Sequence, residues 1–149
     1  MSVYTNASAS DDRTARAVHT IMLIVRIALG LPFIYHGASI AFGAFGGPGL
    51  QGFSAFTHLP LAVAALVGYG EFLGGLGVLF GVLARPAAAG LAIIMLGAIT
   101  TVHLKNGYDS TKGGFEYQLT LLFLEIIVMI GGAGIYNALT LVRPKKDTI

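Results

Sequence analysis

The sequence predicts an all-α integral membrane protein, an antiparallel bundle of four helices with both termini in the cytoplasm. Of its 149 residues, 55% are hydrophobic and 11% are charged, so too few polar side chains are present to cover a soluble domain. The stretches that are apolar and long enough to cross a bilayer as helices are Val18–Phe42, Leu61–Ala84, Pro86–Leu104 and Glu116–Val142. None alternates as a barrel strand does, and all are far longer than such a strand.

The distribution of Lys and Arg sets the expected orientation. Basic residues before span one, between spans two and three, and after span four are Arg13, Arg16, Arg85, Arg143, Lys145 and Lys146. The opposite side carries only Lys105 and Lys112, and this bias places both termini in the cytoplasm. We therefore expect a polar cytoplasmic tail over residues 1–17, a membrane domain over 18–142 and a basic cytoplasmic tail over 143–149.

The connections between the spans carry proline and glycine signals. Pro86 suits the first position of a helix, so we expect spans two and three to form a tight hairpin. The glycine-rich segment 43–52 is interpreted as a turn-rich flap over the outer mouth of the bundle. Gly70 and Gly74 form a small-xxx-small pair, which is typical of closely packed helices.

Three ionisable residues lie deep inside the predicted spans and are the candidate catalytic residues. Arg26, Glu71 and Glu125 are about eight to ten residues from the ends of their spans, roughly 12 to 15 Å deep. A charge at that depth is costly, so all three are expected to face protein and not lipid. Helical periodicity agrees, because Glu71 shares a stripe of small residues with Gly68 and Gly75.

We expect Arg26 and Glu71 to be ion-pair partners, with Glu125 nearby in the bundle interior. One cation against two carboxylates leaves excess negative charge, so one carboxyl group is expected to hold a proton near neutral pH. Two interpretations stay open. The pair is either a structural device that fixes helix register or part of a proton site coupled to a ligand such as a quinol.

A second polar group lies near the outer ends of the spans. It consists of His36 in span one, His103 at the end of span three, and Glu116 and Tyr117 at the start of span four. Antiparallel spans bring these candidate ligand-binding residues to one mouth, where they can bind a quinone carbonyl, a haem or a metal. No HxxxH or HExxH spacing identifies a metal, and an ordinary interfacial hydrogen-bonding role is the alternative.

Together these residues resemble the DoxX family of small four-span membrane proteins. The motifs that carry the resemblance are Arg26-x-x-x-Gly30, His36-Gly37, Glu71-x-x-Gly74-Gly75, Gly81-x-x-x-Arg85, His103, Gly114-x-Glu116-Tyr117 and Gly132-x-Gly134-x-Tyr136. The resemblance implies a multi-pass protein of a prokaryotic cytoplasmic membrane. The family name derives from a subunit of an archaeal thiosulfate:quinone oxidoreductase, and relatives are linked to oxidative-stress complexes. Two family charges are missing, a lysine near residues 38–40 and an aspartate near residues 137–139.

The leading hypothesis is a membrane subunit of an oxidoreductase system that binds a quinone or another small apolar redox partner. The chain has no cysteine, so electrons are expected to come from a bound cofactor or a partner protein. The expected partners are the lipid bilayer, a membrane or redox protein and a second copy of the chain, but not nucleic acid. The alternatives are a non-enzymatic scaffold or assembly factor and, third, a small proton-linked transporter.

Overall fold

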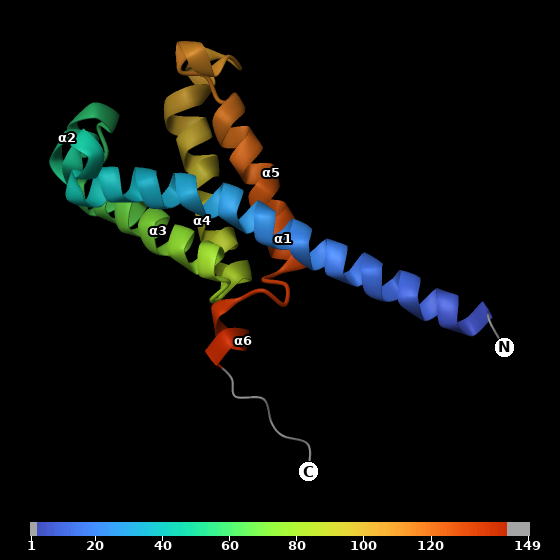
Figure 1. The fold of residues 1–149 in the computed structure, drawn as a ribbon. Helices are drawn as coiled ribbons and strands as arrows, with labels where there is room; N and C mark the ends of the chain where they lie inside the picture. The colour runs from blue at the N-terminus through green and yellow to red at the C-terminus, as the bar shows by residue number, and fades with distance from the viewer. Residues whose placement is uncertain (1–2, 143–149) are drawn as a thin grey trace.

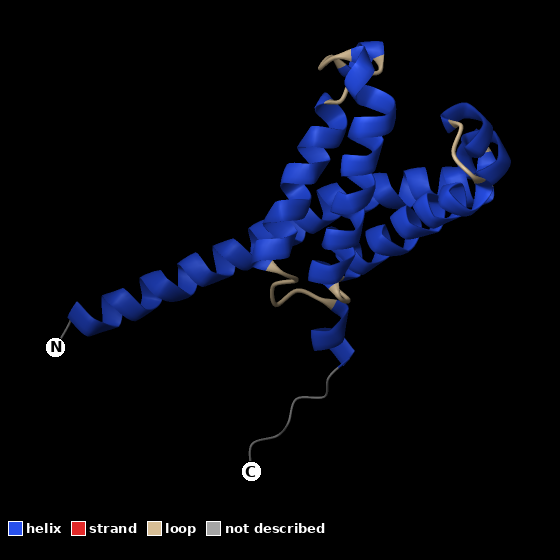
Figure 2. Cartoon of the chain, turned by 180° about the vertical axis from the view of Figure 1, so that it is seen from behind, coloured by secondary structure: helices blue, strands red, loops and turns tan. Residues whose placement is uncertain are grey.

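The computed structural model describes residues 3–142, with side chains for residues 11–140, as an assembly of helices (Figure 1). In chain order the α-helices in this range are α1 (Val3–Phe42), α2 (Gly49–Thr57), α3 (Leu61–Phe80), α4 (Ala84–Ala98), α5 (Glu116–Gly131) and α6 (Ala138–Val142). A π-helical turn over Ile99–His103 and a 3-10 turn over Leu104–Asn106 prolong α4. Further 3-10 turns cover Ala44–Gly46 and Ser110–Lys112, and no strand occurs between residues 3 and 142 (Figure 2).

Three helices of the described chain are long and apolar enough to cross a membrane. They cover Asp11–Phe42, Leu61–Phe80 and Ala84–Asn106. These ranges match the first three predicted spans, and they make the chain a multi-pass membrane protein.

The fourth predicted span differs from the structure. A continuous helix over Glu116–Val142 was expected, but α5 ends at Gly131 after 16 residues. It ends there because Gly132 and Gly134 take φ angles of 71° and 67°, in the left-handed region that a helix cannot contain. At about 1.5 Å per residue, α5 is roughly 24 Å long.

Two polar or glycine-rich segments are more helical than expected. The predicted N-terminal tail is part of α1 from Val3 onward, and this part of the helix extends beyond the others (Figure 1). In segment 43–52, turns occupy only the first residues, and α2 begins at Gly49. The predicted basic tail over 143–149 lies outside the described residues.

The helices form two pairs that diverge. α1 lies along α3, and α4 lies along α5 (Figure 1). The pairs meet near the turn between α3 and α4, called here the hairpin end. They separate toward α2 and residues 104–115, called here the mouth. A cluster of buried side chains fills the region where the pairs meet, and its largest members are Met22, Leu29, Phe33, Val78, Leu91, Met95, Leu121 and Val128.

Glycines let α1 and α3 approach until their backbones touch. A Cβ on Gly37 would lie 2.2 Å from the Phe72 nitrogen, and a Cβ on Gly30 would lie 2.9 Å from the Gly75 carbonyl oxygen. The predicted stripe on α3 is buried, since Ala64, Gly68, Glu71 and Gly75 all face inward, and Val78 extends it toward the hairpin end. This close contact directs the Glu71 side chain into the protein interior.

Replacing Gly81 with alanine is expected to destabilise the hairpin end. Gly81 has a φ of 71°, and a Cβ there would lie 2.7 Å from Arg26 Nη2. Backbone strain alone costs about 1–2 kcal/mol, and the contact adds to it. Gly90→Ala is the control, because a Cβ on Gly90 meets no atom within 4 Å. Thermal unfolding in detergent should show a lower midpoint for Gly81→Ala only, and equal midpoints would contradict this account.

Candidate functional site

Arg26 is held at the hairpin end by backbone carbonyl groups. Its side chain is fully enclosed, with 1% of the residue exposed. Nε donates to the Val78 carbonyl oxygen at 2.8 Å, and Nη2 donates to that of Leu79 at 2.7 Å. Nη1 donates to the carbonyl oxygens of Ala133 and Tyr136 at 2.5 and 2.7 Å. One guanidinium therefore joins α1 to the last turn of α3 and to the segment that follows α5.

These carbonyl groups need donors because of where they lie. The last turn of any helix has carbonyl groups without an intrahelical partner, and the chain after α5 is not helical. In a membrane such groups must find partners within the protein. Arg85 acts similarly at the neighbouring helix, where its Nη2 donates to the Ile130 carbonyl oxygen at 3.2 Å. Positive charge at the carboxyl ends of α3 and α5 also suits the helix dipole.

The expected ion pair between Arg26 and Glu71 is wrong. Within the described chain the guanidinium has carbonyl partners, and no contact to a carboxylate lies within 4.0 Å. Glu71 lies seven residues before Val78 on α3, a rise of about 10 Å. The expectation that both side chains are buried is correct, but Arg26 binds the last turn of α3, whereas Glu71 lies near the middle of that helix.

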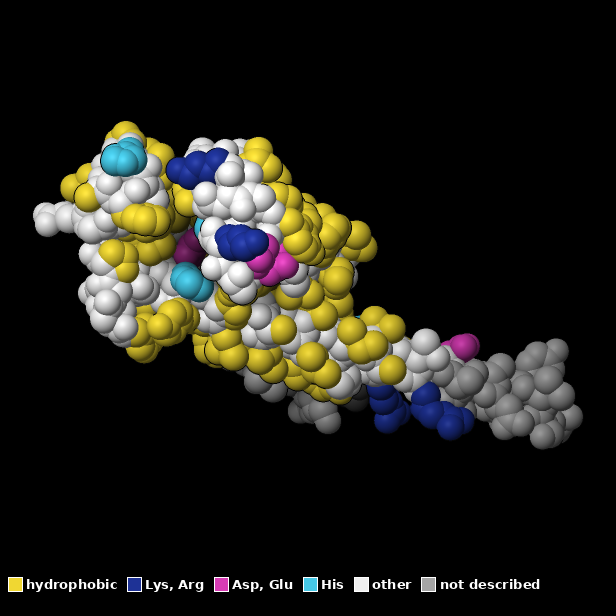
Figure 3. Space-filling model, turned by 90° about the horizontal axis from the view of Figure 1, so that it is seen from above, with side chains coloured by type: hydrophobic (Ala, Val, Ile, Leu, Met, Phe, Trp, Pro, Cys, Tyr) yellow, Lys and Arg dark blue, Asp and Glu magenta, His cyan; other side chains and the backbone are white. Residues whose placement is uncertain are grey.

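A cavity of about 530 Å³ lies between the two helix pairs on the mouth side. Viewed toward the mouth, the surface is hollowed between two lobes, with acidic and histidine side chains in and beside the hollow (Figure 3). Most of the lining is apolar and comes from α1, α2, α3, α4 and α5. Its larger apolar members are Phe33, Ile40, Phe53, Phe56, Leu59, Val63, Leu66, Val67, Ile93, Ile94, Met95 and Leu121.

Glu71 brings a carboxyl group to the wall of this cavity. The residue is 6% exposed, and its Oε2 atom is buried without a hydrogen-bond partner. Glu125 does not line the cavity, but it lies close enough to interact electrostatically with Glu71. It is fully buried, and both of its carboxylate oxygens lack a partner. The two acids therefore form a buried group that no cation of the described side chains neutralises by an ion pair.

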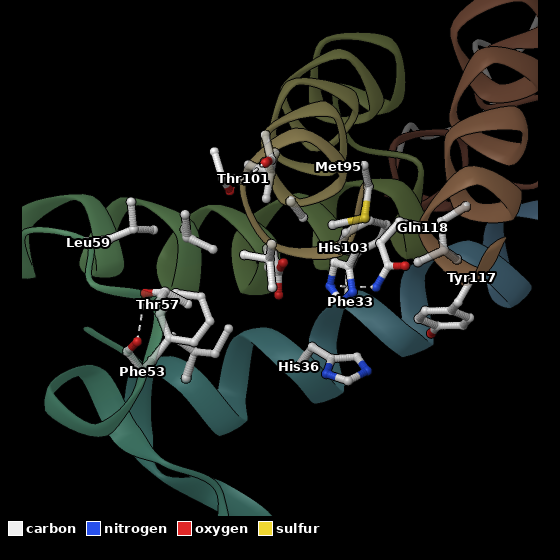
Figure 4. Close-up of a pocket in the computed structure, with 18 of the residues that line it drawn as sticks. Phe33, His36, Phe53, Thr57, Leu59, Met95, Thr101, His103, Tyr117 and Gln118 are labelled. Carbon is white, nitrogen blue, oxygen red and sulfur yellow. Dashed lines mark hydrogen bonds between the residues drawn. The ribbon is translucent and has the colours of Figure 1, made fainter. Parts of the chain in front are cut away.

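His103 and Gln118 form a hydrogen-bonded pair in the cavity wall (Figure 4). The His103 Nδ1 atom lies 2.7 Å from the Gly113 carbonyl oxygen, which can only accept, so Nδ1 carries the proton. In the neutral imidazole, Nε2 is then the acceptor, and Gln118 Nε2 donates to it at 3.0 Å. His36 and Tyr117 lie on the same side of the cavity, with ring centroids 6.3 Å apart.

The segment between α4 and α5 holds the Gly113 carbonyl group over His103. Glu116 does not line the cavity, because its Oε1 accepts from the backbone N–H and the hydroxyl of Ser110. The Thr111 hydroxyl and backbone N–H both donate to Asp109 and lower the pKa of that carboxyl group. These bonds close the loop on itself.

The structure thus brings together part of the predicted site. His36, His103 and Tyr117 meet Glu71 at the cavity, whereas Arg26 and Glu116 lie elsewhere. Gln118 was not predicted as a site residue, although its spacing of seven from Glu125 places both on one face of α5. The flap predicted over the mouth from segment 43–52 includes the first residues of α2, but the helix itself and its aromatic contribution to the cavity were not predicted. Within the described chain no three His, Cys, Asp or Glu side chains gather closely enough to hold a metal ion.

Fold and site together define a small multi-pass helical membrane protein with buried acids beside an apolar cavity. The sequence profile of the DoxX family matches residues 21–104, and the chain belongs to the DoxX family. A protein of Bacillus subtilis (strain 168) named "Putative oxidoreductase CatD" is 32% identical over 117 residues, which cover 74% of this chain and 78% of that protein. No solved structure matches the chain.

Replacing Gly114 with alanine is expected to free His103 from its loop partner. A Cβ on Gly114 would lie 2.4 Å from the Gly107 carbonyl oxygen and 2.7 Å from that of Asp109, so the loop must open. Nitrogen-15 NMR of the imidazole should then show both tautomers in place of one. Lys112→Ala is the control, because Lys112 makes only an exposed ion pair with Asp109. A single, unchanged tautomer in Gly114→Ala would contradict the role given to the loop.

Proposed function

We propose that the chain is the membrane subunit of an oxidoreductase system and binds a quinone or a similar small apolar redox partner. The observation that carries this proposal is the cavity of about 530 Å³ with the Glu71 carboxyl group in its wall. A cavity of this size lined mainly by apolar side chains, with few polar groups, is typical of a small-molecule site. Membership of the DoxX family and a relative named as an oxidoreductase support the redox assignment.

In this proposal the polar side of the cavity binds the head of the ligand. His36, Tyr117 and the His103–Gln118 pair offer hydrogen-bonding groups to a carbonyl or hydroxyl oxygen. The remaining wall is mainly apolar apart from the Glu71 carboxyl group, and it limits the access of water to the ring. Glu116 is assigned a supporting role in the loop and not a contact with the ligand.

Glu71 and Glu125 are assigned to proton exchange. Reduction of a quinone to a quinol consumes two electrons and two protons, and oxidation releases both. Glu71 is placed to exchange a proton with the ligand, and Glu125 is the neighbouring carboxyl group that shares the proton with it. The electrons come from or go to a partner protein or a cofactor that it carries. Arg26 takes no proton in this scheme and secures the helix ends.

The proposal includes four membrane crossings in the cytoplasmic membrane of a prokaryote, with both termini in the cytoplasm. α5 is shorter than the other spans. The loop at the mouth extends the chain beyond its first residue, and at the hairpin end Arg85 and Arg26 bind carbonyl groups at and after its last turn. Arg13, Arg16 and Arg85 belong to the hairpin side, and Lys105 and Lys112 belong to the mouth side. The membrane domain would then cover residues 18–142.

Glu71→Gln is expected to abolish proton uptake that accompanies ligand reduction, while the protein still inserts and binds the ligand. The amide keeps the size and polarity of the side chain but cannot carry the proton. Uptake is measured with a pH indicator during reduction of a bound quinone by an external reductant. Glu116→Gln is the control, because this acid lies outside the cavity. Unchanged uptake in Glu71→Gln would contradict the assignment.

A wild-type protein that binds no quinone and carries no redox group would favour the scaffold or assembly role.

A further inference from the structure

We infer that the cavity takes a neutral-headed amphiphile with an apolar tail, which enters sideways from the lipid phase between α3 and α4. This inference rests on the proposed function, since it specifies which apolar redox partners the cavity accepts. Three observations carry it. The cavity reaches the exposed surface between α3 and α4, a cluster of hydrogen-bonding side chains lies on another side of it, and its described lining contains no Lys or Arg.

The cavity reaches the molecular surface between α3 and α4. Leu66 on α3 and Ile93 on α4 both line it, and they are 70% and 72% exposed. Leu66 lies five residues after the start of α3, about 8 Å along the helix. Ile93 is near the middle of the Ala84–Asn106 span. The opening between these side chains therefore lies at the depth of the hydrocarbon and not of the aqueous phase.

Another side of the cavity carries a cluster of hydrogen-bonding side chains. His36 on α1 and Tyr117 on α5 approach each other, with ring centroids 6.3 Å apart. The His103–Gln118 pair lies beside them, whereas Phe53, Thr57 and Leu59 lie across the cavity (Figure 4). The cavity lining thus changes from hydrogen-bonding side chains on one side to mainly apolar side chains on the other. A ligand that matches it has a polar ring at one end and an apolar chain at the other.

The charges in the wall exclude the commonest amphiphile of the bilayer. Among the described residues that line the cavity, none is Lys or Arg, and Glu71 is an acid. A phosphate head group placed beside Glu71 would lack a cationic partner among these residues. A ring with carbonyl or hydroxyl substituents carries no charge and can use the hydrogen-bonding groups instead. The occupant is therefore a tailed quinone or quinol and not a phospholipid.

The wall of α4 offers a position at which the path of the tail can be blocked without disturbing the fold. Gly97 lines the cavity about one helical turn after Ile93, and a Cβ placed on Gly97 meets no atom within 4 Å. A side chain can therefore start at this position without a backbone clash, and leucine has a better helix propensity than glycine. Gly90 lies two turns earlier on the same face, also with no atom within 4 Å, but it does not line the cavity. Gly97→Leu and Gly90→Leu are thus a matched test and control.

The experiment compares two ligands in lipid vesicles, a dimethoxymethylbenzoquinone with a decyl chain and the same ring without the chain. Affinities are referred to the concentration of each ligand within the bilayer, so that partitioning does not count as binding. We expect the tailed ligand to bind more tightly to the wild type. Gly97→Leu should reduce that affinity about tenfold, the loss expected when a few buried methylene contacts are forfeited. The ring alone should be little affected, and Gly90→Leu should behave as the wild type.

The outcomes separate the two proposals. A tail that adds no affinity, or an equal loss for both ligands in Gly97→Leu, would overturn the sideways entry while quinone binding stands. Failure of the wild type to bind either ring would overturn the proposed function itself. A photoreactive group at the end of the decyl chain should label the protein near Leu66 and Ile93. Labelling near α2 or residues 104–115, or a phospholipid that the quinone cannot displace, would also overturn the inference.

Discussion

The arrangement depends on one guanidinium that binds backbone carbonyl groups inside an apolar bundle. Arg26 ties α1 to the end of α3 and to the non-helical segment after α5, so that backbone irregularity at this end is satisfied by protein. Its donors lie in a planar fork, which suits several acceptors at once. Gly81 leaves room for this group by having no side chain. The junction keeps the two helix pairs together at one end and lets them diverge at the other.

The divergence creates the cavity, and the use of Arg26 elsewhere leaves the acids beside it without a cation. Glu71 and Glu125 are buried with oxygens that lack partners, which is costly unless a proton is present. In a membrane interior, such groups are by default candidates for a functional site. The arginine that binds carbonyl groups lies at the hairpin end, whereas the two acids lie within α3 and α5, between that end and the mouth. The loop over His103 adds a third element, because it sets which imidazole nitrogen faces Gln118.

Hydropathy and periodicity predicted the first three spans, the buried stripe of Glu71 and the inward direction of Arg26. They did not predict the partners of Arg26. These partners are backbone carbonyl groups, which every residue has, so residue type does not reveal which of them accept a hydrogen bond. The break at Gly132 was missed because the hydrophobic run continues through it, and only the backbone angle reveals the end of α5. His36, His103 and Tyr117 were correctly expected at one mouth. Glu116 was grouped with them by its position, but Ser110 holds its carboxylate in the loop.

The most direct test of this account is a double-mutant cycle on the free energy of unfolding in lipid or detergent, using Arg26→Met and Glu71→Gln. Loss of the guanidinium leaves several buried carbonyl groups unpaired, at a cost of about 1–3 kcal/mol for each group. Glu71→Gln should leave stability unchanged or raise it, and the two effects should add within about 0.5 kcal/mol. A loss of about 3–5 kcal/mol in Glu71→Gln, absent when Arg26 is already replaced, would show that the two side chains form a buried ion pair and would contradict the account.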